Sequence, residues 1–205
     1  MVAVSVLLVC VPVLFQAPLV RTLPWVSFVA TFVWWAGAIA LNKHQSTAHW
    51  GDLLMGFTWT WLAGTIYWGW FRWEPLLHLP IECIGVPFAI WALRRDQGKI
   101  GHWFYLGSLF GTAITDVYFY LVRLLPYWRQ VMQVPPTEAR AILHQALLLV
   151  ETSWGYTYAI LLVGILLGVG CLPLKLGQLH WYAFGGAVLS TLLVDGLFLI
   201  AAILA

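Results

Sequence analysis

Long runs of apolar residues, separated by short polar stretches, set the pattern along this chain. An α-helix needs about 20 mostly apolar residues to cross the hydrocarbon core of a bilayer. The pattern therefore predicts an all-α bundle of about seven transmembrane helices, forming a single integral membrane domain over residues 1–205. The predicted spans are residues 2–20, 24–41, 50–72, 80–93, 102–125, 154–173 and 181–204.

Two of these spans contain internal prolines. Pro12 and Pro18 lie in the first span, and Pro80 and Pro87 lie in the fourth. Proline removes a backbone donor and bends a helix, and membrane helices tolerate it where neighbouring groups satisfy the freed carbonyls. We expect a kinked first span and a fourth span that is short, and bent or partly re-entrant.

The interval between the fifth and sixth spans has a different pattern. Pro135 and Pro136 stop any preceding helix, and apolar residues then recur at helical spacing up to Val150, with Arg140 and His144 among them. This alternation predicts an amphipathic helix over residues 137–151, lying at the membrane interface or docked on the bundle. We expect a break near residues 153–155 to separate it from the sixth span.

Composition agrees with a membrane protein and gives no support for nucleic-acid binding. The chain is 62% hydrophobic and 9% charged, and its mean hydropathy is +0.86. A net charge of +2 without a basic run gives no reason to expect nucleic acid as a partner. With seven spans, five Lys or Arg residues fall on each side of the membrane, so positive charge leaves the orientation open.

A His-Trp pair opens three of the spans. The pairs begin at His49, His102 and His180, and each is followed by a threonine ten or eleven residues after the histidine. This recurrence suggests an internal repeat of helical hairpins. The alternative is that histidine and tryptophan simply favour the membrane interface. As axial ligands, these three histidines are candidates to hold the metal of a chlorin or haem near one membrane face.

Two carboxylates lie inside predicted spans. Asp116 and Asp195 occupy similar depths in the fifth and seventh spans, and a lipid-facing carboxylate would cost about 2.5–3.5 kcal/mol on insertion scales. If the two helices touch, the pair can share a proton. Otherwise, each carboxylate bonds a neighbouring polar group and has a structural role. The candidate neighbours on its own helix are Tyr105, Thr112 and Arg123 for Asp116, and Thr191 for Asp195. Arg123 lies about two turns from Asp116, so we do not expect a direct bond, and a partner from another helix is favoured.

Small residues mark two helix faces suited to close contact. Gly107 and Gly111 form a G-x-x-x-G pattern in the fifth span, and Gly164 and Gly168 form another in the sixth. Such pairs let helix backbones approach closely in membranes, either within the chain or with a partner protein.

A third candidate group consists of Glu74, His78 and Glu82. Their spacing would place all three near one face of a helix, as metal ligands require. Pro80 argues against an unbroken helix there, and no second Glu-x-x-His completes a di-iron set. The alternative is an interfacial turn in which Glu74 caps the helix that Pro75 begins. We therefore predict no metal site.

Several longer runs stand out along the chain, among them Tyr67-Trp-Gly-Trp-Phe-Arg-Trp-Glu-Pro75, Thr115-Asp-Val-Tyr-Phe-Tyr120 and His180-Trp-Tyr-Ala-Phe-Gly-Gly-Ala-Val-Leu-Ser190. With these runs the chain resembles an uncharacterised family of multi-pass membrane proteins of cyanobacteria and the chloroplast lineage. The resemblance implies a thylakoid setting beside photosynthetic complexes.

Two classes of function follow from these features. The first is a non-catalytic accessory or assembly factor that docks on a larger photosynthetic membrane complex, photosystem II or one of its assembly intermediates. The candidate cofactors are chlorophyll and carotenoid. The second is a membrane enzyme or transporter for a lipophilic or small polar substrate, using Asp116 and Asp195. The lack of a nucleophile system or complete ligand set favours the first class.

Overall fold

The computed structural model describes residues 1–204, apart from the Pro136 side chain, and this part of the chain is helical with no strand. Short π-helical and 3₁₀ turns join or extend several of the helices. The α-helices are α1 (Val2–Val11), α2 (Ala17–Thr22), α3 (Pro24–Asn42), α4 (Ala48–Ile66), α5 (His78–Glu82), α6 (Val86–Arg94), α7 (Lys99–Leu121), α8 (Leu125–Gln133), α9 (Pro136–Val150), α10 (Ser153–Cys171) and α11 (Leu179–Leu204).

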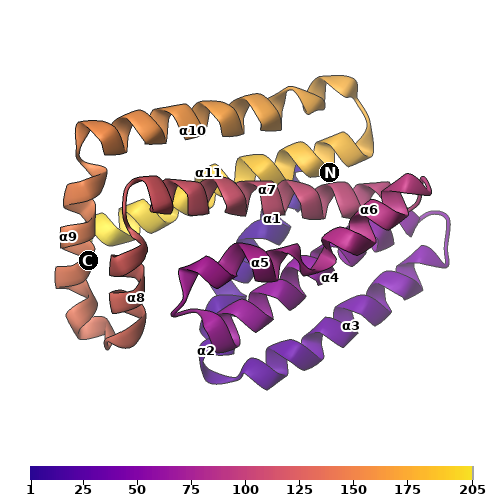
Figure 1. The fold of residues 1–205 in the computed structure, drawn as a ribbon. Helices are drawn as coiled ribbons and strands as arrows, with labels where there is room; N and C mark the ends of the chain where they lie inside the picture. Colours follow the sequence, from indigo (N-terminus) through magenta and orange to yellow (C-terminus); the bar gives the residue numbers. More distant parts are fainter. Residues whose placement is uncertain (205) are drawn as a thin grey trace.

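The helices form one elongated bundle. In Figure 1 most of them run roughly side by side, while α8 and α9 stand across one end. The most extensive contacts join α7 to α11, α3 to α4, and α4 to α7. The centre of the molecule is therefore built from α4, α7 and α11, and the candidate site lies between the first two of these and α5.

Five helical segments are long and apolar enough to cross a membrane. They are Val2–Thr22, Pro24–Asn42, Pro75–Arg94, Ser153–Leu176 and Leu179–Leu204, and a sixth is added if α7 and α8, bent by 100°, count as one span. The fourth span thus begins at Pro75 rather than at residue 80. By this criterion the described residues hold five or six spans, where the apolar runs predict seven.

The difference arises at α7, which meets the criterion only together with α8, and at α4, which does not meet it. More than half of this helix is buried, and its buried residues include Gly56, Thr60 and Thr65. Other helices, rather than lipid, surround these positions, so the side chains there need not be strongly apolar. A helix in this position has a lower mean hydropathy than one at the periphery.

The contact between α7 and α11 depends on small residues. A Cβ atom added at Gly107 would lie 2.6 Å from the Phe184 carbonyl oxygen, and one added at Gly111 would clash with the Thr191 hydroxyl. At the start of the same contact, the rings of Trp103 and Trp181 lie 4.7 Å apart. The two helices are therefore parallel and in close contact.

The second small-residue pattern has no such role among the described residues. Apart from the backbone of its own helix, no described atom would come within 4 Å of a Cβ added at Gly164 or Gly168. These glycines lie on α10, at the edge of the bundle in Figure 1.

A buried glutamine joins the first helices to α4. Gln16 ends a π-helical turn, Pro12–Gln16, and is fully buried. Its Nε2 donates to the Trp61 carbonyl at 2.6 Å and to the Thr65 hydroxyl at 2.7 Å. The Trp61 indole in turn donates to the Ser27 carbonyl of α3 at 2.9 Å. This network satisfies the Gln16 amide nitrogen and the Trp61 indole, which lipid cannot satisfy, while Gln16 Oε1 has no hydrogen-bond partner among the described residues.

The segment predicted as an amphipathic helix forms α9. It ends at Val150, and Thr152 accepts a hydrogen bond from the Gly155 amide at 3.0 Å, capping α10. A threonine in this position starts a new helix and ends the previous one. The break therefore falls at residues 151–152, just before the predicted 153–155.

Candidate functional site

The site begins at the break between α5 and α6. Pro80 and Pro87 lack the N–H that a continuous helix needs, and a 3₁₀ turn over Cys83–Gly85 separates the two helices. The Tyr105 hydroxyl of α7 donates to the Glu82 carbonyl at 2.5 Å and accepts from the Gly85 amide at 3.1 Å. Tyr105 therefore holds the broken helix against α7.

Three ionisable side chains meet across this contact. His78 Nδ1 lies 3.0 Å from Asp116 Oδ1, and His78 Nε2 lies 4.0 Å from Glu82 Oε1. The Glu82 side chain is about nine-tenths buried, whereas Asp116 is 27% exposed. We call His78, Glu82 and Asp116 the imidazole cluster. One imidazole thus lies between two carboxylates, within segments that resemble membrane spans.

An aromatic ring fixes the orientation of the imidazole. The helix α4 continues as a π-helical turn, Tyr67–Phe71, and this turn places the buried Tyr67 ring on His78. The two ring centres lie 4.2 Å apart at an angle of 28°, which is a stacked arrangement. π-Helical turns often occur at functional sites, where they redirect side chains.

Asp195 has a different partner from the one predicted. The Thr115 hydroxyl of α7 donates to Asp195 Oδ2 at 2.9 Å, while Thr191, the predicted partner, contacts Gly111 instead. Consecutive residues in an α-helix point about 100° apart. Thr115 therefore faces α11 while Asp116 faces α5, and the two carboxylates bond different groups.

The other predicted neighbours of Asp116 lie elsewhere. Tyr105, Thr112 and Arg123 form no hydrogen bond with it in the described part of the chain. Arg123 is exposed, has a positive φ of 62° and lies in the turn after α7, two residues beyond Leu121. As expected from its distance along the helix, it does not neutralise the carboxylate.

Glu74 does not join His78 and Glu82 as a ligand. It accepts two hydrogen bonds from Arg129 of α8, at 2.7 and 3.2 Å, and one from the Leu76 amide at 3.2 Å. The Arg129 guanidinium, together with the Leu76 amide, lowers the pKa of the Glu74 carboxyl. Within residues 1–204 no group of three His, Cys, Asp or Glu side chains could hold a metal ion. Glu74 thus caps the turn that begins at Pro75.

The three His-Trp pairs do not make one site. His49 and His102 line the same hollow at the end of the bundle opposite α8, and His180 lies outside its lining. Asp52, which sequence reasoning did not select, fixes this end of the bundle: its oxygens accept from the Ile100 amide at 2.8 Å and the Gly101 amide at 3.1 Å. Pigment binding by these histidines stays a prediction.

The family match covers nearly all of this architecture. A model described as "Protein of unknown function (DUF3120)" matches residues 5–203. The chain belongs to the DUF3120 family. This confirms the expectation of an uncharacterised family, and the match includes every residue of the imidazole cluster. No curated protein and no solved structure matches the DUF3120 chain.

The chemistry available in this DUF3120 chain follows from the cluster. Imidazole is the side chain that most readily gains and loses a proton near neutral pH. A carboxylate at each side stabilises the protonated ring, and ionisable groups inside membrane segments often mark proton pathways. Sequence reasoning selected all three residues and favoured a partner for Asp116 from another helix, but it considered His78 only as a possible metal ligand and did not pair the two. The useful signal is that a buried acid needs a partner, and His78 is an unassigned polar residue in the neighbouring span.

Proposed function

We propose that this protein is a proton-coupled membrane transporter for a small polar or lipophilic solute, with the imidazole cluster as its proton-binding site. The observation that carries the proposal is the 3.0 Å contact between His78 Nδ1 and Asp116 Oδ1, with the nearly buried Glu82 near the other nitrogen. This differs from the non-catalytic class that the sequence favours.

The arrangement suits proton exchange better than simple cross-linking. A hydrogen bond between α5 and α7 needs one donor and one acceptor, and an amide pair would supply both. The cluster instead places two carboxylates beside one imidazole. Burying charged groups in a membrane segment is unfavourable, and such groups usually have a function there. In the proposed cycle, His78 takes up a proton, Asp116 and Glu82 stabilise the imidazolium, and loss of the proton resets the site.

Proton flux in proteoliposomes tests this proposal. The purified chain is reconstituted with a pH-sensitive dye inside the vesicles, and proton entry is driven by an imposed membrane potential, with and without candidate solutes. We expect flux in the unmodified protein and its loss in His78→Gln and Asp116→Asn. The amide at position 116 keeps the hydrogen bond, so this variant separates proton transfer from structure.

Glu74→Gln is the matched control. It removes a carboxylate from the ion pair with Arg129, outside the cluster, and should leave the flux unchanged. If His78→Gln and Asp116→Asn conduct protons as the unmodified protein does, the cluster is a structural contact and the proposal is wrong.

The number of membrane crossings is also part of the proposal. We infer seven crossings, with α4 as the third and α7 as the fifth. The side-by-side arrangement of these helices with the five apolar segments in Figure 1 supports this count. Cysteines placed at Lys43, in the loop before α4, and at Arg72, after the π-helical turn that continues α4, should then react with an impermeant thiol reagent from opposite sides of sealed vesicles. If both cysteines react from the same side of the vesicles, α4 does not cross the membrane and the inferred number of crossings is wrong.

A second candidate function rests on α10. We propose, as the alternative, a thylakoid accessory or assembly factor that docks on photosystem II or one of its intermediates through the Gly164 and Gly168 face. The support is that no atom of residues 1–204 outside the helix's own backbone lies within 4 Å of a Cβ at either glycine, together with the family resemblance. In membranes such a face is suited to a helix of another protein.

Co-purification from native membranes in mild detergent tests the alternative. Replacing both glycines with leucine should crowd the helix contact and reduce the recovered partner. Val163→Leu, on the same helix and 40% exposed but turned away from the face of the two glycines, is the control and should have no effect. Unchanged recovery with the double glycine variant would exclude this docking face.

A further inference from the structure

Three aromatic side chains lie beside the imidazole cluster, on the side of α8. The ring of Trp68, in the π-helical turn, lies 5.6 Å from the ring of Trp128 in α8, and Trp128 lies 5.8 Å from Phe119 of α7. We call these three side chains the aromatic face. Trp68 also contacts the His78 ring at 6.5 Å, and Phe119 follows Asp116 by one turn on the same face of α7. The aromatic face therefore adjoins the cluster from two elements.

The cluster and the aromatic face are both accessible from outside the protein. The His78 side chain is 21% exposed, the Asp116 side chain is 27% exposed, and all three aromatic rings are half-buried. Val117 and Tyr120, next to Asp116 on α7, are exposed. A solute that arrives along these apolar side chains can therefore contact a carboxylate and aromatic rings together.

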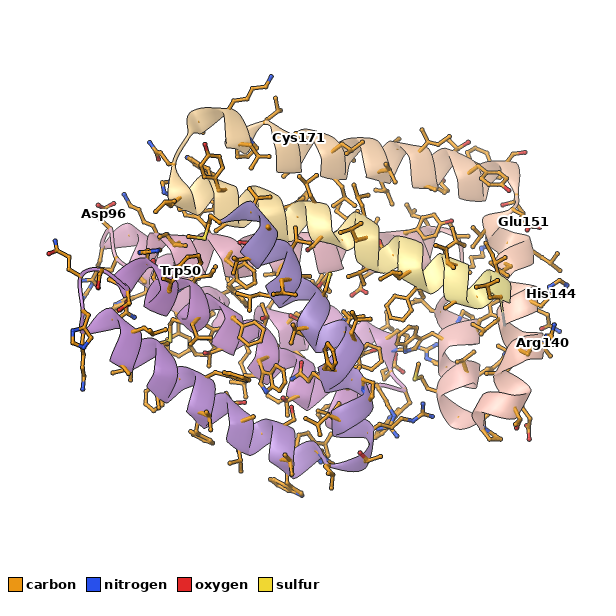
Figure 2. The ribbon with its side chains drawn as sticks, turned by 180° about the vertical axis from the view of Figure 1, so that it is seen from behind. Trp50, Asp96, Arg140, His144, Glu151 and Cys171 are labelled. Carbon is orange, nitrogen blue, oxygen red and sulfur yellow. The ribbon has the colours of Figure 1, made fainter. Side chains whose placement is uncertain are left out.

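The cluster has an excess of negative charge. Its two carboxylates lie beside one imidazole, so one negative charge remains even when His78 is protonated. Among residues 1–204 no Lys or Arg forms an ion pair with either carboxylate, and Arg129 is bonded to Glu74. Figure 2 shows Arg140 and His144 at the outer edge of α9, where both are exposed. The charge at this site therefore favours a cation.

The geometry favours an organic cation over a metal ion. Asp116 and Glu82 lie beside different nitrogens of His78, so their oxygens do not converge on one small ion, and no group suited to a metal occurs within residues 1–204. An ammonium group needs only one carboxylate, and the exposed Asp116 supplies it. Aromatic rings attract an ammonium group through the negative charge on their faces, and they also pack against an apolar body.

We propose that the solute of the imidazole cluster is a lipophilic organic cation, such as an aryl ammonium, which the protein exchanges for a proton. This inference rests on the proposed transporter function. The titratable groups that face His78 are Glu82 on its own helix, Asp116 on α7 and Tyr67 in the turn after α4. When the ammonium pairs with Asp116, the imidazolium loses part of its stabilisation and releases the proton on Nε2, while Nδ1–H continues to donate to Asp116. One positive charge replaces another, so the charge of the cluster is unchanged.

Binding of benzyltrimethylammonium to the purified full chain in mild detergent tests this inference. Tryptophan fluorescence reports binding, and the pH of a weakly buffered solution reports the protons released. We expect saturable binding that releases protons near neutral pH and becomes tighter as the pH rises, because protons and the cation compete. Phenylmethanesulfonate has a similar size and a negative charge, and it should not bind.

Variants assign the binding to this surface. Phe119→Leu keeps an apolar side chain but removes one aromatic ring, and it should weaken binding about fivefold. Phe71→Leu is the matched control, because Phe71 is exposed in the same π-helical turn but lies outside the aromatic face, and it should bind as the unmodified protein does. His78→Gln should bind the cation without releasing protons, and Asp116→Asn should lose binding.

The outcomes separate this inference from the transporter proposal. Proton flux in proteoliposomes without binding of the ammonium would overturn the inference and leave the proton site in place. Equal binding of the sulfonate, or unchanged binding in Asp116→Asn, would also overturn it. Cation binding with proton release but without flux would support the ligand assignment and contradict transport. The comparison of the two ligands uses the unmodified protein, so it decides the charge of the ligand even if Phe119→Leu does not fold.

Discussion

Replacing Gly107 with alanine should weaken the contact between α7 and α11. The new Cβ atom would lie 2.6 Å from the Phe184 carbonyl oxygen and 3.2 Å from the Ala187 Cβ. Because the nearest of these atoms belongs to the backbone, no side-chain rotation relieves the contact. The two helices must therefore move apart by about half an ångström along an interface that is otherwise close-packed.

The size of the effect follows from two opposing terms. Overpacking at a buried contact costs about 1–3 kcal/mol. Alanine also favours the helical state over glycine by up to about 1 kcal/mol. Gly164→Ala has the same gain in helix propensity and no clash, since nothing lies within 4 Å of its Cβ. The difference between the two variants should therefore equal the packing cost alone.

Thermal unfolding in mild detergent, followed by tryptophan fluorescence, measures this difference. For a chain of this size 1 kcal/mol shifts the midpoint by about 2–4 °C, so Gly107→Ala should unfold about 2–12 °C below Gly164→Ala. Both substitutions lie in a G-x-x-x-G pattern, so the pattern itself is held constant. Equal midpoints would refute the close α7–α11 contact.

Three further outcomes are expected. The Glu74 carboxyl has a lowered pKa in the folded protein, so its pairing with Arg129 stabilises the fold above the ordinary carboxyl pKa, and this stabilisation is lost as the pH falls through the lowered value. The thermal midpoints of Glu74→Gln and the unmodified protein should therefore converge in acid. A constant gap between the midpoints would contradict the pairing. Gln16→Leu should lower the free energy of unfolding by about 1–3 kcal/mol, because it removes bonds from the first helices to α4, as measured by chemical unfolding in detergent. The Asp195→Asn variant should accumulate normally in membranes, since its amide oxygen still accepts from Thr115, whereas the Asp195→Leu variant should accumulate less. Immunoblotting of both membrane fractions measures this difference. Equal levels of the two variants would argue against a structural role for the bond between Thr115 and Asp195.

Much of the local structure could be predicted from the sequence. Apolar runs located the peripheral helices, because lipid-facing residues must be apolar along their whole length. Pro135 and Pro136 located the start of α9, and Pro80 and Pro87 indicated the broken span. Each of these signals comes from the chemistry of a single segment.

The site could not be predicted in the same way. The contact between His78 and Asp116 joins residues 38 positions apart, and the bond between Thr115 and Asp195 joins residues 80 apart. Which side of α7 faces α5 depends on how the helices are rotated against each other. That rotation is set by contacts such as the one at Gly107, and periodicity within one helix does not reveal it.

The most direct test of the imidazole cluster is a pH titration followed by infrared difference spectroscopy on the protein in lipid. A proton-binding pair should give imidazole bands from His78 and carboxylate bands that change over the same pH range. The account predicts that these coupled bands disappear in both His78→Gln and Asp116→Asn, and persist in Glu74→Gln. Coupled bands that persist in His78→Gln, or no titrating imidazole in the unmodified protein, would contradict the proposed proton site.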